Sequence, residues 1–259
     1  MQRIHDAFAR TRYCGGALIV YITAGDPSLD DTVELALAAE RGGADIIELG
    51  IPYSSPVADG PVIQEACRRA LEGGATVRGG LAAAARSRER SQAPLVLMTA
   101  FNPVLIFGLD RFAAAAAEAG VDGVLISDLP AAEAGAWSQA AAEHDLGTVL
   151  LVAPDNTDEQ MRGALAMTTG FCYVVSRPGT TGARADLYEG LRELVVRTGG
   201  MASVPVAVGF GLSDADQVRE VLAMADGAIV GSAIVRVIAA GNADGGLSAR
   251  VQEAVAALR

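Results

Sequence analysis

The amino-acid sequence contains no lysine, so arginine supplies all 20 of its basic side chains. Enzymes that hold a carbonyl substrate or pyridoxal phosphate as a Schiff base use a lysine amine to do so. The missing lysine therefore excludes Schiff-base aldolase chemistry and pyridoxal phosphate chemistry for this chain acting alone.

Histidine and cysteine are scarce and widely separated. The two histidines, His5 and His144, and the three cysteines, Cys14, Cys67 and Cys172, form no C-x-x-C motif. A zinc site is therefore not expected. An odd number of distant cysteines is typical of reduced thiols, which predicts a cytoplasmic protein.

Positive charge and long apolar runs are also in short supply. The net charge of −11 argues against binding to nucleic acid or to an anionic membrane surface, since both need a cationic face. No apolar run reaches the roughly 18 residues of a membrane span. Residues 1–12 carry scattered charges and lack the apolar core of a signal peptide, so none is expected. Aromatic residues make up only 5%, which predicts a core of Ala, Val, Leu and Ile.

Short apolar runs alternate along the chain with Ala-rich segments of helical period, which is typical of repeated βαβ units. Helices are clearest over residues 62–72 and 109–118, and over a segment that Ser28 or Asp30 can cap and that ends near Arg41. The eight predicted strands are residues 17–23, 45–51, 94–100, 123–128, 147–153, 171–176, 204–209 and 227–232.

Eight such units in a chain of 259 residues indicate an α/β fold, a single-domain (β/α)8 TIM barrel over residues 1–259. A doubly wound open sheet is the alternative, although it usually has about six strands. The strands are almost continuously apolar, as expected of a parallel sheet that is covered on both faces. In such a barrel the functional residues follow the carboxyl ends of the strands.

Two acids stand near the carboxyl end of the second predicted strand. Glu48 interrupts an apolar run, and Asp59 lies in the turn-rich loop that follows. A buried charge is costly unless it is paired or used. The structural interpretation is a carboxylate bonded to nearby amides; the functional one is an acid on a rigid strand that faces a second acid on a loop.

Two glycine-containing turns follow the seventh and eighth predicted strands, in V-G-F-G-L-S (208–213) and V-G-S-A-I-V (230–235). Glycine lets backbone amides approach a ligand, and a helix start adds partial positive charge. Glycines at these two strand ends match the phosphate site of (β/α)8 barrels. The sequence therefore predicts a small phosphorylated substrate.

The motif E-L-G-I-P-Y-S-S-P-V-A-D-G-P-V-I-Q (48–64) resembles the signature of the tryptophan synthase α subunit family. Supporting motifs follow in the family's order, among them Y-I-T-A-G-D-P (21–27), S-D-L-P (127–130), S-R-P-G-T-T-G (176–182) and G-S-A-I-V (231–235). The resemblance covers nearly the whole chain. It implies cleavage of indole-3-glycerol phosphate to indole and glyceraldehyde 3-phosphate, without a metal, nicotinamide or pyridoxal cofactor.

The resemblance also implies the roles of individual residues. Glu48 would be the general acid–base, and Asp59 would accept a hydrogen bond from the indole N–H. Thr181 would bond the loop aspartate when the loop after the sixth strand closes as a lid. The expected substrate-binding residues are Tyr21, Met98, Leu125 and Phe210 around the indole, Tyr173 beside the glycerol phosphate, and Gly182, Gly211, Gly231 and Ser232 at the phosphate.

The sequence departs from the family's pattern at three positions. The usual P-F-S-D-P reads Pro-Tyr-Ser-Ser-Pro here, and Ser55 replaces an aspartate that faces the β subunit in the family. Ala100 replaces a common aromatic residue, and Pro178 stiffens the start of the lid. A β subunit in an α2β2 complex stays the expected partner, with a free-standing lyase, a non-catalytic activator of a β subunit and a sugar-phosphate isomerase or epimerase as alternatives.

Overall fold

The computed structural model describes residues 1–57, 59–175, 190–209, 211–241 and 246–259. Eight parallel strands form a closed barrel in the order β1 to β8, with β8 paired to β1. The (β/α)8 barrel is confirmed, and the open doubly wound sheet is excluded. The strands are β1 (Ala17–Thr23), β2 (Ile46–Gly50), β3 (Leu95–Thr99), β4 (Gly123–Ile126), β5 (Gly147–Val152), β6 (Cys172–Val175), β7 (Val206–Gly209) and β8 (Gly227–Val230).

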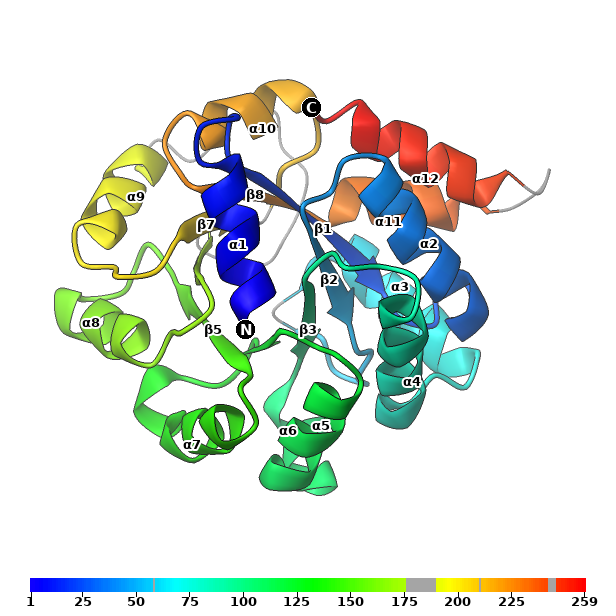
Figure 1. Cartoon of the computed structure of the whole chain (residues 1–259), viewed down its shortest axis with the longest axis horizontal. Helices are drawn as coiled ribbons and strands as arrows, with labels where there is room; N and C mark the ends of the chain where they lie inside the picture. Colours follow the sequence, from blue (N-terminus) through cyan, green and yellow to red (C-terminus); the bar gives the residue numbers. More distant parts are fainter. Residues whose placement is uncertain (58, 176–189, 210, 242–245) are drawn as a thin grey trace.

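Helices surround the strands (Figure 1). In the described ranges they are α1 (Gln2–Thr11), α2 (Leu29–Arg41), α3 (Pro61–Glu72), α4 (Val77–Arg88), α5 (Phe101–Phe107), α6 (Leu109–Glu118), η1 (Ala131–Glu133), α7 (Gly135–Glu143), α8 (Asp158–Ala166), α9 (Leu191–Gly199), α10 (Ala215–Leu222), α11 (Ser232–Ala239) and α12 (Leu247–Ala256). None of these helices has the length and apolar character needed to cross a membrane.

The sequence pattern located some of these helices and missed others. Helix α2 begins after Ser28, whose hydroxyl accepts a hydrogen bond from the Asp31 amide at 3.0 Å, as the capping pattern predicts. Helix α6 has the predicted bounds. Helices α1, α4 and α5 were not predicted, because charges, two adjacent glycines and Pro103 respectively weaken their helical signal.

Alternate residues of each strand pack on opposite faces, and both faces are buried. In β1, Ile19 and Tyr21 point into the barrel, whereas Val20 packs against the outer helices. Ile46 of β2 also points inward, and the period of two places Glu48 on the same inner face. This double burial explains why the strands are continuously apolar and why an inward carboxylate stands out.

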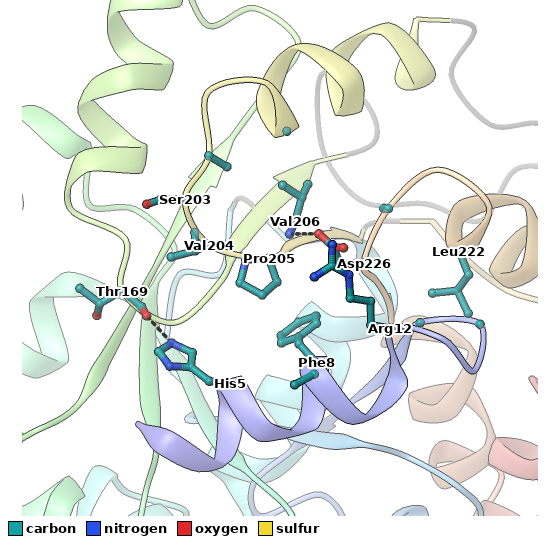
Figure 2. Close-up of a pocket in the computed structure, with 16 residues that line it drawn as sticks. His5, Phe8, Arg12, Thr169, Ser203, Val204, Pro205, Val206, Leu222 and Asp226 are labelled. Atoms are coloured by element: carbon teal, nitrogen blue, oxygen red, sulfur yellow. Dashed lines mark hydrogen bonds between the residues drawn. The ribbon is translucent and has the colours of Figure 1, made fainter.

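Helix α1 closes the amino-terminal end of the barrel. Ile4 and Phe8 are buried there, and the Phe8 ring lies 5.6 Å from the ring of Phe171. The Nε2 atom of His5 is 2.9 Å from the Thr169 carbonyl oxygen, so α1 is also bonded to the segment before β6. A groove of about 630 Å³ runs beside α1 at this end. Figure 2 shows His5 and Phe8 pointing from α1 toward the strand ends.

Three aspartates tie neighbouring strands together at this same rim. Asp45, Asp122 and Asp226 each stand directly before a strand, and each carboxylate accepts a hydrogen bond from the first part of the preceding strand in the barrel. The donors are the backbone amides of Leu18, Leu95 and Val206, at 2.9, 2.9 and 2.8 Å. The acids at the amino-terminal rim therefore have a structural role, because their carboxylates are bonded to backbone amides of neighbouring strands.

Candidate active site

Glu48 lies on the inner face of β2 with a relative exposure of 1%. Its Oε1 atom has no hydrogen-bond partner within the described part of the chain. Burial, and after it the negative charge of Asp59, raises the pKa of the Glu48 carboxyl to about 8. The interpretation of Glu48 as a carboxylate bonded to nearby amides is therefore wrong for this oxygen. At neutral pH the side chain is a neutral acid that carries a proton.

Asp59 closes the same space from the loop between β2 and α3. Its side chain is 4% exposed, and Tyr53 donates a hydrogen bond to its Oδ2 atom at 3.2 Å. Burial raises the pKa of Asp59 to about 6, and the bond from Tyr53 opposes that rise. Near pH 7 the pair therefore consists of an ionised Asp59 and a protonated Glu48. Two carboxyl groups whose pKa values differ in this way are suited to separate acid and charge-stabilising roles.

Two tyrosines of the inner face flank the acids, and each lies over a glycine of a neighbouring strand. A Cβ atom at Gly50 would overlap the Tyr21 hydroxyl, and one at Gly209 would overlap the Tyr173 hydroxyl. The Tyr21 hydroxyl also accepts a hydrogen bond from Thr23 at 3.2 Å. The glycines make room for two aromatic rings at the top of the barrel, where a flat ligand needs apolar walls.

Backbone turns after β7 and β8 form another part of the cavity lining. Gly211 has φ +91°, a conformation that glycine adopts without strain. Gly231 precedes α11, which begins at Ser232 and points its amino terminus at the cavity. Free amides at a helix start are suited to an anion such as phosphate.

The structure brings most of the predicted site residues together. The cavity at the carboxyl ends of the strands is lined by Tyr21, Glu48, Asp59, Ile63, Met98, Tyr173, Gly211, Ile229, Gly231 and Ser232. Leu125 is fully buried in the barrel interior but does not line the cavity. Thr181, Gly182 and Phe210 lie outside the described residues.

Sequence reasoning missed Ile63 and Ile229, which line the cavity, and the bond from Tyr53 to Asp59. Alternation along β8 could have located Ile229, since its neighbours in the strand, Ala228 and Val230, pack on the outer face. No sequence signal gives the Tyr53 bond, because it depends on how the loop folds. In the described ranges, no three His, Cys, Asp or Glu side chains are grouped so as to bind a metal ion.

Comparisons with known proteins identify the family of this chain. The family profile described as tryptophan synthase alpha chain matches residues 8–258. A tryptophan synthase alpha chain from Roseiflexus castenholzii is 44% identical over the full length of both chains, and one from Solibacter usitatus is 46% identical over 86% of this chain and 83% of its own.

Solved structures show the same relationship. A chain of Mycobacterium tuberculosis tryptophan synthase superposes with a TM-score of 0.91 at 37% identity, covering 99% of this chain and 96% of that one. A chain of the Pyrococcus furiosus tryptophan synthase α2β2 complex gives 0.87 at 38% identity, covering 94% and 97%. The chain belongs to the tryptophan synthase alpha chain family.

Proposed function

We propose that this chain cleaves indole-3-glycerol phosphate to indole and glyceraldehyde 3-phosphate, with Glu48 as the general acid–base and Asp59 as the group that binds the indole N–H. The observation that carries the proposal is a buried carboxyl that has one oxygen without a partner in the described part of the chain and a pKa raised to about 8, beside the carboxyl of Asp59, whose pKa is about 6. Family membership supplies the reaction, and this pair supplies its acid and its counter-charge.

The first step protonates the ring. Glu48 transfers its proton to C3 of the indole, which converts the ring to a cation whose charge is shared with the ring nitrogen. Asp59, ionised and bonded to that N–H, stabilises the charge as it forms. Burial favours the step on both counts, because it keeps Glu48 protonated and strengthens the attraction between Asp59 and the cation.

The second step breaks the carbon–carbon bond. The Glu48 carboxylate left by the first step takes the proton of the hydroxyl on the carbon attached to the ring. That carbon becomes the aldehyde of glyceraldehyde 3-phosphate, and the electrons of the broken bond return to the ring as neutral indole. Glu48 ends the cycle protonated, as it began, so one group serves as acid and then as base.

The remaining residues hold the substrate. Tyr21, Met98 and Tyr173 give the indole and glycerol portions their walls, and the turns at Gly211, Gly231 and Ser232 offer amides to the phosphate. Backbone amides are the natural donors in a chain that lacks lysine. In this proposal Leu125 shapes the floor from below. Thr181, Gly182 and Phe210 keep their predicted roles in the lid, the phosphate site and the indole pocket.

A tryptophan synthase β subunit is the expected partner, since the Pyrococcus furiosus relative forms an α2β2 complex with mutual activation. Large apolar side chains support a docking surface at the same rim: Val57 is 76% exposed, and Leu105 and Ile106 of α5 are 54% and 78% exposed. Ser55, in place of the family's aspartate, favours the free-standing lyase as the second candidate.

Residues 1–259 are proposed to form one domain, and the protein is proposed to act in the cytoplasm. The closed barrel supports the first, because its eighth strand pairs with its first and leaves no separate unit in the described residues. Three free thiols, Cys14, Cys67 and Cys172, support the second.

A turnover assay with indole-3-glycerol phosphate tests both parts of the proposal. We expect the isolated chain to release indole and glyceraldehyde 3-phosphate in equal amounts, and an added β subunit to raise turnover roughly tenfold or more, a usual size for coupling between sites. No indole under either condition would overturn the lyase. High turnover alone, without stimulation, would leave the lyase standing and overturn the α2β2 partnership.

A further inference from the structure

Tyr53 stands at a position of the family signature that is usually phenylalanine, so its hydroxyl group is an addition to the usual pattern. The hydroxyl oxygen lies 3.2 Å from Oδ2 of Asp59 and 3.4 Å from the Ser127 hydroxyl oxygen. An ionised carboxylate only accepts hydrogen bonds, so the single Tyr53 proton points to Asp59. Ser127 is then the donor in the second contact.

We propose that Tyr53 is a positioning residue for the reaction. Its hydroxyl group donates a hydrogen bond to Oδ2 of Asp59, and the other carboxylate oxygen is left to accept a hydrogen bond from the indole N–H. The inference rests on the proposed function of Asp59 and adds to it the group that orients the carboxylate. A carboxylate at the end of a loop can rotate about its side-chain bonds, and each rotation loses the alignment that catalysis needs.

The backbone of Asp59 is fixed separately, so the side-chain bond has its own task. Gln64 donates a hydrogen bond from Nε2 to the Asp59 carbonyl oxygen at 2.7 Å, and the next residue, Gly60, is the N-cap of α3. These contacts set where the loop enters α3. They leave the carboxylate free to turn, and in the described part of the chain its hydrogen bond comes from Tyr53.

Tyr53 in turn is connected to the barrel wall. Ser127 follows β4, and its backbone amide donates a hydrogen bond to the carbonyl oxygen of Thr99, at the end of β3, at 2.9 Å. The path from Thr99 through Ser127 and Tyr53 therefore links Asp59 to two adjacent strands. A loop acid held by a strand-anchored donor has a defined direction before the substrate arrives.

The effect of the Tyr53 hydrogen bond can be measured as a change in the pKa of Asp59. The titratable groups that face it from the described elements are Glu48 of β2, Tyr21 of β1, Tyr173 of β6 and Cys67 of α3, together with Tyr53 itself. Burial is the main cause that raises the pKa of Asp59, and the Tyr53 bond lowers it. Removing the hydroxyl takes away that lowering contribution.

The pH profile of kcat/KM is the test. Activity needs Asp59 ionised and Glu48 protonated, so the profile should be a bell that rises near pH 6 and falls near pH 8. Tyr53→Phe keeps the ring and loses the hydroxyl. We expect it to lower kcat/KM roughly tenfold, as loss of one hydrogen bond to a charged group does, and to move the rising limb up by about one pH unit.

Three further variants complete the experiment. Tyr13→Phe is the matched control, because Tyr13 is 88% exposed at the far end of the barrel, and it should behave as the wild type. Ser127→Ala should move the rising limb in the same direction by a smaller amount, and it carries the test if Tyr53→Phe does not fold. Asp59→Asn tests the proposed function itself, which predicts that this variant is inactive.

The outcomes separate cleanly. A Tyr53→Phe protein with the wild-type profile, or with lower kcat/KM and an unmoved rising limb, overturns the positioning role while Asp59→Asn remains inactive. If Asp59→Asn keeps wild-type activity, the proposed function of Asp59 fails instead. A shifted rising limb with an unchanged falling limb supports the inference.

Discussion

Each end of the barrel buries one acid to the same degree, but the two acids differ in their hydrogen-bond partners. Asp122, before β4, is 1% exposed and is surrounded by donors: Arg88 at 2.8 Å, the Leu95 amide at 2.9 Å and Arg3 at 3.0 Å. Glu48, at the carboxyl end of β2, is also 1% exposed, and its Oε1 atom has no partner in the described ranges.

Burial alone therefore does not distinguish a functional acid from a structural one; the number of hydrogen-bond donors around the carboxyl group does. Three donors offset the cost of removing Asp122 from water, and they hold its carboxyl group in one place. Glu48 meets the same cost by holding its proton, since its pKa rises to about 8. One end of the barrel uses a buried acid to join strands, and the other keeps a proton ready for transfer.

Removing the proton carrier should have the largest effect on activity. Glu48→Gln replaces a neutral acid with a neutral amide of similar shape, so the chain should fold normally. Turnover of indole-3-glycerol phosphate should fall roughly 10³-fold, a usual contribution of general acid–base catalysis. Steady-state assays beside thermal unfolding curves check this. A variant that retains most of its activity would show that another group moves the proton.

Removing the structural acid, Asp122, should lower stability and leave activity unchanged. Asp122→Asn takes the charge from a site that holds Arg88, whose side chain is only 13% exposed. Breaking a buried pair in this way should lower the free energy of unfolding by about 3 kcal/mol. Activity per folded molecule should stay near that of the wild type. Denaturant unfolding and an active-site titration measure the two quantities.

Arg3→Gln is the smaller companion change. The Arg3 side chain is 43% exposed, so its bond to Asp122 is weakened by solvent, and its loss should cost less than about 1 kcal/mol. Equal losses of stability for Asp122→Asn and Arg3→Gln would contradict the view that Arg88 and the Leu95 amide are the main partners of the buried carboxylate.

The sequence alone located the barrel, because eight apolar runs with helices between them admit few other folds. It also placed Glu48 at the functional end, since an acid in the second run had to lie near a strand terminus. It could not show that Asp122 is surrounded by hydrogen-bond donors whereas Glu48 has an oxygen without one in the described ranges. The distinction rests on donors from distant segments, Arg3 and Arg88 among them, that only the folded chain brings together.

Local packing was equally hidden from the sequence. Gly50 and Gly209 each make room for a tyrosine from a neighbouring strand, a contact that no spacing along the chain encodes. Leu125, which was expected beside the indole, is buried in the same interior cluster as Met98 and Tyr21, and its role in binding stays a prediction. The resemblance transferred residue types and order, whereas the contacts of Tyr53 with Asp59 and Ser127 emerged from the folded loop.

Titration of Glu48 itself tests most directly whether this side chain carries a proton at neutral pH. Carboxyl-labelled glutamate followed by carbon NMR should show one resonance that titrates near pH 8, far above an ordinary glutamate near 4.3, and that resonance should be missing from Glu48→Gln. If every glutamate of the wild-type protein titrates below about pH 5, Glu48 is ionised at neutral pH. It then cannot be the proton donor to the indole ring.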